Sequence, residues 1–365
     1  MHDIEIHCNE EKGQNFIKSI ERKHFLFSFV TSYTETSEIP GITAAGANPD
    51  FIKFTPPADA EFLQYGFCKT IDVIPMTPDG KPTPALLTRA ALNFANIPKI
   101  VINAGSEIFP KMPFIETNLP YGNNISEKPA LEQSTVKEAI DYGRIVGRTL
   151  ASCTNCLVIG ESIPGGTTTA LAVLKGLGID AHVSSSMPEN PKSLKNEVVE
   201  KTLKRSDSKE PHDVIANAGD PMIPFVAGML STASEITNVI LAGGTQMVAV
   251  LAFAKSMGFN EDRVAIGTTS YVIDDKDANL LNMVKSISDI PVLSINPRLE
   301  DSEFDGLRAY SKGFVKEGVG AGGSMITSIL KTGIDSKKLL EYQTKKVMST
   351  IIGLKFQRLM NHYIQ

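Results

Sequence analysis

Two glycine-rich stretches carry the residue types that could perform chemistry in this chain. The first, residues 160–168, reads GESIPGGTT and follows the apolar residues 157–159. An apolar run that stops at Gly160, a glycine loop, and apolar side chains at helical spacing over 170–177 predict a strand, a loop and a helix. The unpaired N–H groups and the positive dipole end of that helix would face an anion at the loop. The stretch therefore predicts a phosphate cradle.

The residues of this cradle have distinct expected roles. Gly165 and Gly166 let the backbone approach a ligand, and Thr167 and Thr168 add hydroxyl donors. The loop has neither the Lys-Ser/Thr pair of a nucleoside-triphosphate loop nor the G-x-G-x-x-G spacing of a dinucleotide fold. A tight strand-to-helix turn with a threonine cap fits the same letters. The carboxylate of Glu161 beside an anion site favours the functional interpretation.

The second stretch, residues 316–323, reads KEGVGAGG and places a glutamate among glycines. Such a run costs backbone entropy on folding and is tolerated where the backbone approaches a ligand or takes a positive φ. Glu317, followed by Gly318 and Gly320, has few neighbouring side chains that could satisfy its carboxylate, so it is a candidate general base. The alternative is a structural carboxylate at a helix start beside a flexible turn. A phosphate cradle with a glycine-held carboxylate favours transfer of a phosphorylated sugar to an incoming nitrogen.

Short apolar runs that end on small or hydroxyl residues recur along the chain. They predict strands at residues 24–31, 100–102, 157–159, 239–241, 264–266 and 292–295, and a further short strand at 181–184. Helices are expected after Thr83-Pro84, from Thr135 through Leu150 behind a capping box with Glu138, and over 194–204, 224–230, 246–255 and 336–360. Residues 37–58 show no period, and such a loop often lines a binding site.

Strands that alternate with helices predict one doubly wound, three-layer α/β/α fold around a parallel sheet. In that architecture ligands bind outside the carboxyl ends of the strands. The loops at Gly105, Gly160, Gly267 and the pair Gly243-Gly244 are therefore expected along one rim.

Composition narrows the class of protein. The chain has 365 residues, of which 42% are hydrophobic and 21% charged, and a net charge of -5, which disfavours nucleic acid as the main ligand. It holds no apolar stretch of membrane-spanning length, so a cytoplasmic protein is expected. Cys153 and Cys156 form a lone C-x-x-C, for which we expect a packing role rather than zinc or redox chemistry. We expect no metal and no cofactor, and the sequence has no His cluster.

The two glycine stretches resemble those of the nicotinate-nucleotide:dimethylbenzimidazole phosphoribosyltransferase family. GESIPGGTT at 160–168 is similar to the bacterial G-E-M-G-I-G-N-T-T, and VKEGVGAGG at 315–323 is similar to L-G-E-G-T-G-A. The segment VILAGGTQM at 239–247 also fits. A group of archaeal relatives resembles both loops almost letter for letter.

This resemblance implies transfer of ribose 5-phosphate from nicotinate mononucleotide to a base nitrogen, in assembly of the cobamide lower ligand. It implies that Glu317 is the catalytic base and Glu161 a second active-site glutamate, that residues 165–168 bind the phosphate, and that Lys195 is an active-site lysine. It further implies a homodimer whose large domain spans 24–330, with a smaller helical subdomain from 1–23 and 331–365.

The chain departs from the bacterial pattern in three places. Gly166 replaces an asparagine, Pro164 enters the loop, and the S-x-E-P-G-H segment has no counterpart. The acceptor stays open among dimethylbenzimidazole, adenine and another purine-like base. A nucleotide-binding or regulatory protein on the same fold is the main alternative function. A nucleotide-dependent oxidoreductase is disfavoured by the glycine spacing.

Overall fold

A computed structural model describes residues 3–46, 48–72 and 81–345. Within these residues eight strands form one sheet in the order β1-β8-β7-β6-β5-β2-β3-β4, and every neighbouring pair is parallel except β1 with β8. The strands are β1 Ile4–His7, β2 Phe25–Thr31, β3 Lys99–Asn103, β4 Ile115–Glu116, β5 Cys156–Ser162, β6 Asn238–Ala242, β7 Val264–Thr269 and β8 Val292–Ile295.

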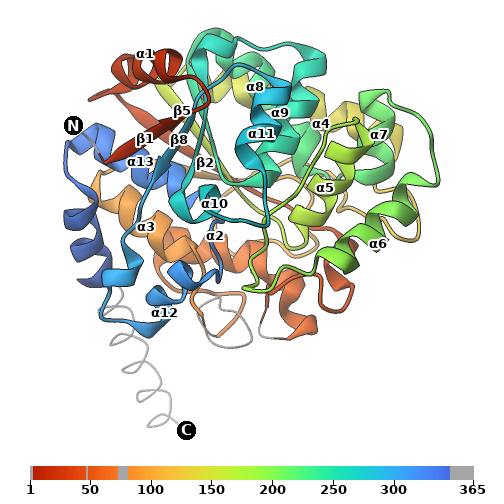
Figure 1. Cartoon of the computed structure of the whole chain (residues 1–365), viewed down its shortest axis with the longest axis horizontal. Coiled ribbons are helices and arrows are strands. Elements are labelled where there is room, and N and C mark those ends of the chain that lie inside the picture. The colour runs from red at the N-terminus through yellow and green to blue at the C-terminus, as the bar shows by residue number, and fades with distance from the viewer. Residues whose placement is uncertain (1–2, 47, 73–80, 346–365) are drawn as a thin grey trace, which may run out of the picture.

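Helices cover both faces of the sheet, because the central strands are apolar on both faces (Figure 1). Leu157 and Ile159 of β5 belong to the core on one face, and Val158 belongs to the core on the other. The first core involves α4 Gln133–Ala151, α5 Gly166–Gly176, α6 Lys192–Leu203, α7 Pro211–Ala218, α8 Met222–Ile236, α9 Thr245–Met257 and α11 Leu280–Ile287. The second involves α1 Glu10–Ile20, α2 Thr55–Tyr65, α3 Ala85–Phe94 and α13 Ala321–Thr332.

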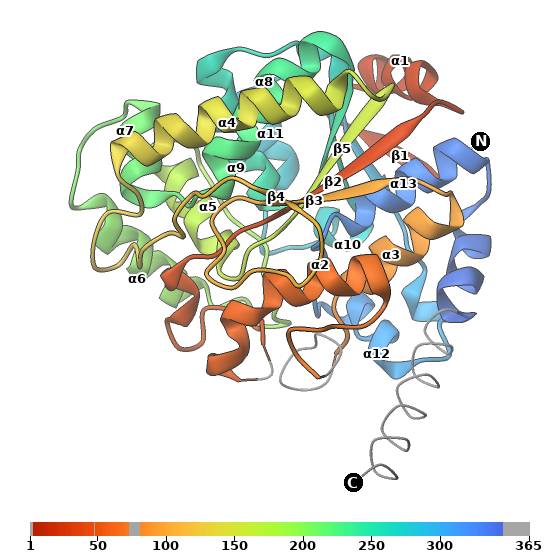
Figure 2. The same cartoon turned by 180° about the vertical axis from the view of Figure 1, so that it is seen from behind.

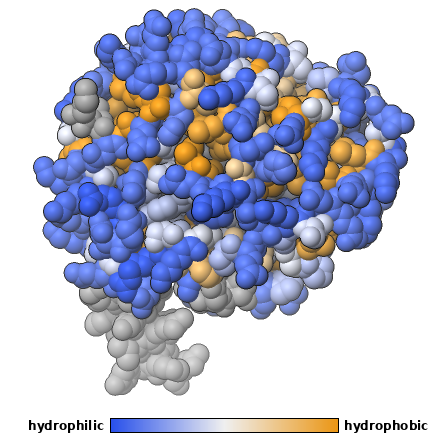
Figure 3. Space-filling model, in the orientation of Figure 1, coloured by the Kyte–Doolittle hydropathy of each residue, from blue (hydrophilic) through white to orange (hydrophobic). Residues whose placement is uncertain are grey.

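The predicted doubly wound α/β/α fold is therefore confirmed. Figure 2 shows the sheet from behind, with α4 and α8 on one side and α3 and α13 on the other. On the face shown in Figure 3, hydrophilic residues cover most of the surface, and apolar ones are visible in patches between them. In the described part of the chain, no helix has the length and apolar character needed to cross a membrane.

The strand order reverses at β2, which lies between β3 on one side and β5 on the other. The connection after β2 leads to β3 on one side of it, and the connection after β5 leads to β6 on the other side. The two connections therefore diverge. In the register of this pair, Val30 is opposite Glu161 and Thr31 is opposite Ser162. The reversal thus leaves a crevice at the carboxyl end of β5, where an open α/β sheet binds its ligand.

The predicted central strands and most predicted helices are present, with shifted ends. β5 extends two residues past Gly160, which places Glu161 inside the strand. The predicted strand at 181–184 is wrong, since those residues form no regular element. The predicted capping box is wrong as well, because α4 begins at Gln133 and Thr135 lies inside its first turn.

Three other segments contain regular structure that the periodicity did not predict. The irregular stretch 37–58 ends in the first turn of α2, whose uninterrupted burial hides any helical period. Two more helices, α7 and α11, lie where the sequence predicted no element. The short helices α10 Ser270–Ile273 and α12 Asp305–Arg308 also lie between β7 and α13.

Asp3 and Ser336, which lie near the two ends of the described residues, contact each other. β1 adds an antiparallel edge strand to the main sheet, and both the backbone N–H and the hydroxyl of Ser336 donate to the Asp3 carboxylate at 2.8 Å. Residues 336–345 are helical, and the rest of the helix predicted to residue 360 lies outside the described residues. The division into a large domain and a terminal subdomain stays a prediction.

Candidate active site

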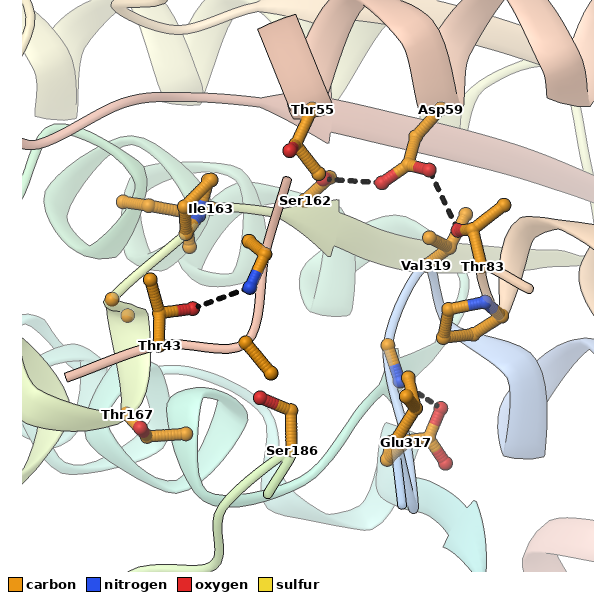
Figure 4. Close-up of a pocket in the computed structure, with 18 of the residues that line it drawn as sticks. Thr43, Thr55, Asp59, Thr83, Ser162, Ile163, Thr167, Ser186, Glu317 and Val319 are labelled. Carbon is orange, nitrogen blue, oxygen red and sulfur yellow. Dashed lines mark hydrogen bonds between the residues drawn. The ribbon is translucent and has the colours of Figure 1, made fainter. Parts of the chain in front are cut away.

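A cavity opens at the carboxyl ends of β5, β6 and β7, at the edge where the sheet topology predicts ligand binding. The empty space within it amounts to about 1280 Å³, a figure that includes the part open to solvent. Residues from distant segments line it: 42–46, 51, 55, 59, 71, 81–84, 161–167, 184–186, 244–246, 272 and 315–319. Figure 4 shows Asp59, Ser162 and Thr83 on one side of the cavity and Thr167 and Ser186 on the opposite side.

Glu317 lies on the cavity wall, held by backbone donors from two elements. Its Oε1 accepts the N–H of Gly318 at 3.1 Å, its Oε2 accepts the N–H of Thr269 at 3.1 Å, and Gly322 N–H reaches both oxygens at 3.2 Å. The Thr268 hydroxyl donates to Oε2 at 3.4 Å. Desolvation by the surrounding protein raises the pKa of Glu317 to about 7, although these donors act to lower it. A carboxyl poised near neutral pH suits a general base.

The loop that carries Glu317 has a backbone conformation that its residues rarely adopt. Val315 and Val319 have φ values of 45° and 54°, in the left-handed region that disfavours β-branched side chains. Each such residue costs on the order of 1–3 kcal/mol and persists only where its surroundings fix it. Here the Val319 N–H donates to the Glu161 carbonyl at 3.1 Å and its own carbonyl accepts the Thr88 hydroxyl at 2.9 Å. The tertiary structure thus sets the position of Glu317.

Glu161 occupies the end of β5, and its side chain is only 3% exposed. Burial raises the pKa of its carboxyl to about 8, with a further upward effect from the nearby Asp220 and Glu317 charges. Asp220 is itself fully buried, accepts the Thr169 hydroxyl at 2.5 Å, and has a pKa raised by burial to about 6. The proximity of these carboxyls favours a protonated Glu161 at neutral pH.

The N-termini of α5 and α9 both open on the cavity. α5 begins after Gly165, whose φ of 76° favours glycine, and a Cβ there would lie 3.0 Å from Cα of Ser37. α9 begins with Thr245, whose buried hydroxyl has no hydrogen-bond partner in the described structure. Two helix dipoles and a hydroxyl without a protein partner form a site that suits an anion.

Two lysines supply positive charge beside these helices. Lys316 lines the cavity, and its Nζ forms a buried ion pair with Asp275 at 2.8 Å. Lys195 lies behind the wall, 1% exposed, and donates to the Ser184 carbonyl at 3.0 Å. Burial lowers the pKa of Lys195 to about 7, and Lys316 lowers it further. One carboxylate against two lysines leaves this side of the cavity cationic whenever Lys195 is protonated.

The structure brings most of the predicted site residues to one cavity. The lining includes both predicted catalytic residues and five of the predicted binding residues, which are Glu161, Glu317, Gly165, Gly166, Thr167, Gly244 and Gly318. The other five adjoin the lining without being part of it: Gly160, Thr168, Lys195, Gly243 and Gly320. Gly160 and Gly320 pack against each other, since a Cβ on Gly160 would lie 3.2 Å from Cα of Gly320. Direct contact of these five with a ligand stays a prediction.

Several lining residues were not predicted. Asp59 comes from a segment without a clear period, Thr83 was predicted only as the start of a helix, and Lys316 was overlooked beside the more prominent Glu317. The Ser-Ser-Ser run at 184–186 was the available signal for a third polar loop. Of the rim loops, those after β5 and β6 line the cavity, whereas Gly105 and Gly267 do not.

The two cysteines of the C-x-x-C pair have different environments. Cys156 is buried at the start of β5, whereas Cys153 is exposed and its thiol donates to the Thr149 carbonyl at 3.5 Å. Across residues 3–46, 48–72 and 81–345, no group of three or more His, Cys, Asp or Glu side chains could hold a metal ion.

The fold and site define an α/β protein whose cavity suits an anion and holds a carboxyl of near-neutral pKa. The family model described as phosphoribosyltransferase matches residues 93–270. A UPF0284 protein of Archaeoglobus fulgidus is 49% identical over 330 residues, covering 90% of this chain and 95% of that protein. A UPF0284 protein of Sulfurisphaera tokodaii is 42% identical, covering 88% and 92%. The chain belongs to the UPF0284 family.

Solved structures with the same fold come from Thermus thermophilus. One, a nicotinate-nucleotide-dimethylbenzimidazole phosphoribosyltransferase, aligns with a TM-score of 0.59 at 17% identity over 88% of this chain and 84% of that one. Another, named CobT, aligns with a TM-score of 0.60 at 16% identity over 87% and 84%. At these identities the likeness establishes the α/β fold that the sequence predicted.

Proposed function

We propose that this protein is a phosphoribosyltransferase that moves ribose 5-phosphate from nicotinate mononucleotide to a ring nitrogen of an aromatic base. The product would be α-ribazole phosphate or its analogue, for assembly of a cobamide lower ligand. The observation that carries the proposal is the position of Glu317, a carboxyl of near-neutral pKa, in the same cavity as the N-termini of α5 and α9. The match of residues 93–270 to the phosphoribosyltransferase model supports it.

The donor's 5-phosphate would bind at the openings of α5 and α9. Gly165 and Thr167 present backbone and hydroxyl donors there, Gly166 lines the cavity while its own N–H donates to the Ile163 carbonyl at 3.1 Å, and Thr245 offers an unpartnered hydroxyl. Lys316, with Lys195 behind it, balances the phosphate charge. Fixing the phosphate at this end holds the sugar carbon in the middle of the cavity, so part of the activation barrier is met by orientation.

In the proposed reaction, a ring nitrogen of the acceptor uses its lone pair to form a bond to C1 of the ribose. The bond from C1 to the pyridinium nitrogen of nicotinate breaks, and its electron pair stays on nicotinate. The proton on the other ring nitrogen of the acceptor passes to Glu317, which the backbone donors hold in place. The products are the new nucleotide, nicotinate and the proton on Glu317.

Glu161 would serve as a neutral hydrogen-bond donor in this scheme. With a pKa of about 8 it holds its proton at neutral pH, and it then adds no negative charge beside Glu317. Its position at the end of β5, between the α5 loop and the Glu317 loop, suits contact with the ribose. On the family resemblance we also propose that the protein is a homodimer that uses small-molecule substrates.

Nicotinate release tests this function. The protein is incubated with nicotinate mononucleotide and a panel of acceptor bases, and nicotinate and the new nucleotide are separated by chromatography. We expect equal amounts of both with at least one base and none without acceptor. If nicotinate mononucleotide binds and no base supports release, the protein is a nucleotide-binding or regulatory module instead.

A further inference from the structure

Helix α2 places an acid in the cavity wall that the sequence analysis did not single out. Asp59 is 3% exposed and lines the cavity across from Thr167 and Ser186 (Figure 4). Its Oδ1 accepts the Thr83 hydroxyl at 2.6 Å, and its Oδ2 accepts the Ser162 hydroxyl at 2.8 Å. No lysine or arginine within the described residues forms an ion pair with Asp59. The carboxylate is therefore buried with two neutral donors.

A second buried acid on the same helix shows what a purely structural carboxylate looks like here. Glu61 is fully buried and does not line the cavity. It accepts the N–H groups of Lys69 at 2.5 Å, Thr70 at 2.8 Å and Lys111 at 2.6 Å, and also the Thr70 hydroxyl. A carboxylate has about four acceptor sites. Glu61 fills them with protein donors, whereas Asp59 leaves about two for a group inside the cavity.

The surroundings of Asp59 suit the edge of a flat ring. Apolar side chains of Ile71, Pro84 and Val319 line the same cavity, and they offer surfaces for stacking. Pro84 also adjoins the Glu317 loop, since a Cβ on Gly318 would lie 3.1 Å from its Cγ. A bicyclic base between these walls could direct one edge at Glu317 and the other at Asp59.

We propose that Asp59 is a specificity-determining residue that accepts a hydrogen bond from the acceptor base. The preferred acceptor is then a bicyclic aromatic nitrogen heterocycle with an amino group on its six-membered ring, as in adenine. Dimethylbenzimidazole has methyl groups and no hydrogen-bond donor on its six-membered ring, and would leave the remaining acceptor sites of the buried carboxylate unpaired, which is unfavourable. This inference rests on the proposed function, because it assigns the Glu317 side of the cavity to the acceptor.

The test compares adenine with purine, which differ only by the amino group. For the wild-type protein we expect kcat/KM to be at least about tenfold higher with adenine, the value of a hydrogen bond to a charged group. In Asp59→Asn the adenine value falls at least about tenfold and the purine value changes less than about threefold. Asp207→Asn makes the same chemical change at an exposed site and keeps wild-type rates.

A structural role for Asp59 predicts a different pattern. Ser162→Ala removes a donor to Asp59 and keeps the carboxylate, so the preference for adenine should persist in it. Equal losses for adenine and purine in both Asp59→Asn and Ser162→Ala would overturn the proposal. If Asp59→Asn does not fold, as judged by thermal unfolding, the wild-type ratio decides, and a ratio near one overturns the proposal.

Calorimetric titration with adenine and purine, in the presence of nicotinate mononucleotide, separates this inference from the proposed function. Tighter binding of adenine that is lost in Asp59→Asn supports the role of Asp59 even where no nicotinate is released, and in that case only the transferase function fails. Equal binding of the two bases by the wild-type protein overturns the inference even where the transferase reaction is observed.

Discussion

Two helices of the site, α5 and α13, start in the same way. Each begins directly after a glycine in the left-handed conformation, Gly165 with a φ of 76° and Gly320 with a φ of 67°. The two loops differ in how they use the N–H donors of the helix start. In α13, Gly322 N–H binds the carboxylate of Glu317 from the same loop. The start of α5 instead lies open on the cavity.

The same helix start therefore serves two purposes in this protein. At α13 the positive end of the helix dipole is matched by an internal carboxylate, so the loop positions a base. At α5 no carboxylate of its own loop takes that place, so the dipole can act on a ligand anion. A substitution that removes the carboxylate held at α13 should therefore lower turnover. A substitution that removes a hydrogen-bonding group at the start of α5 or α9 should weaken the binding of nicotinate mononucleotide.

The largest expected effect comes from Glu317→Gln. Turnover should fall by about a hundredfold or more, because the general base is removed, while the affinity for nicotinate mononucleotide changes little. Initial rates of nicotinate release and calorimetric titration of the donor measure the two quantities. Glu303→Gln, at an exposed site, is the matched control. Unchanged turnover in Glu317→Gln would remove the proposed mechanism.

The pH dependence of kcat/KM should reflect the ionisation of Glu317. Glu317 has a pKa raised to about 7 and acts as a base only when ionised, so kcat/KM should rise about tenfold per pH unit below about 7 and level off above it. Because Glu161 lies close, the observed values belong to the coupled pair. Rates between pH 5.5 and 8.5 give the profile. A flat profile over this range is incompatible with Glu317 as the base.

Thr245→Val tests the role of the α9 start in binding the phosphate. The change removes a buried hydroxyl that no protein group satisfies, so we expect KM for nicotinate mononucleotide to rise about threefold to tenfold and stability to hold or increase. Steady-state kinetics and thermal unfolding measure these effects. Ser328→Ala removes another buried, unpartnered hydroxyl that does not line the cavity and should leave KM unchanged. A fall in kcat with constant KM would contradict the division of roles.

The smallest effect is on stability, through Glu161→Gln. The folded-state pKa of Glu161 is about 8, above the ordinary value of 4.5, so its contribution to stability is full below about pH 4.5 and is lost as the pH rises through about 8. Glutamine cannot ionise, so the variant should exceed the wild type by about 1 kcal/mol or more at pH 9 and match it near pH 4. Urea unfolding at both pH values measures this. An equal difference at the two pH values, or none beyond that of exposed Glu138→Gln, would contradict it.

Much of the fold was predictable from local patterns. The apolar runs at β2, β5, β6, β7 and β8 are buried on both faces, and strands of that kind belong in a parallel sheet. The edge strand β1 and helix α2 were not predicted. β1 is short and polar on one face, and α2 is buried over most of its length, so neither shows a clear period.

By itself the sequence determined the parallel sheet, the two glycine loops and Glu161 and Glu317, because each follows from residue types that lie close together in the chain. Only the tertiary structure decided what faces these glutamates. Asp59, Thr245 and Lys316 come from segments far apart in sequence, and the crossovers of the sheet bring them to one cavity. The pKa values of the site have the same origin, since burial and neighbouring charges depend on packing rather than on local sequence.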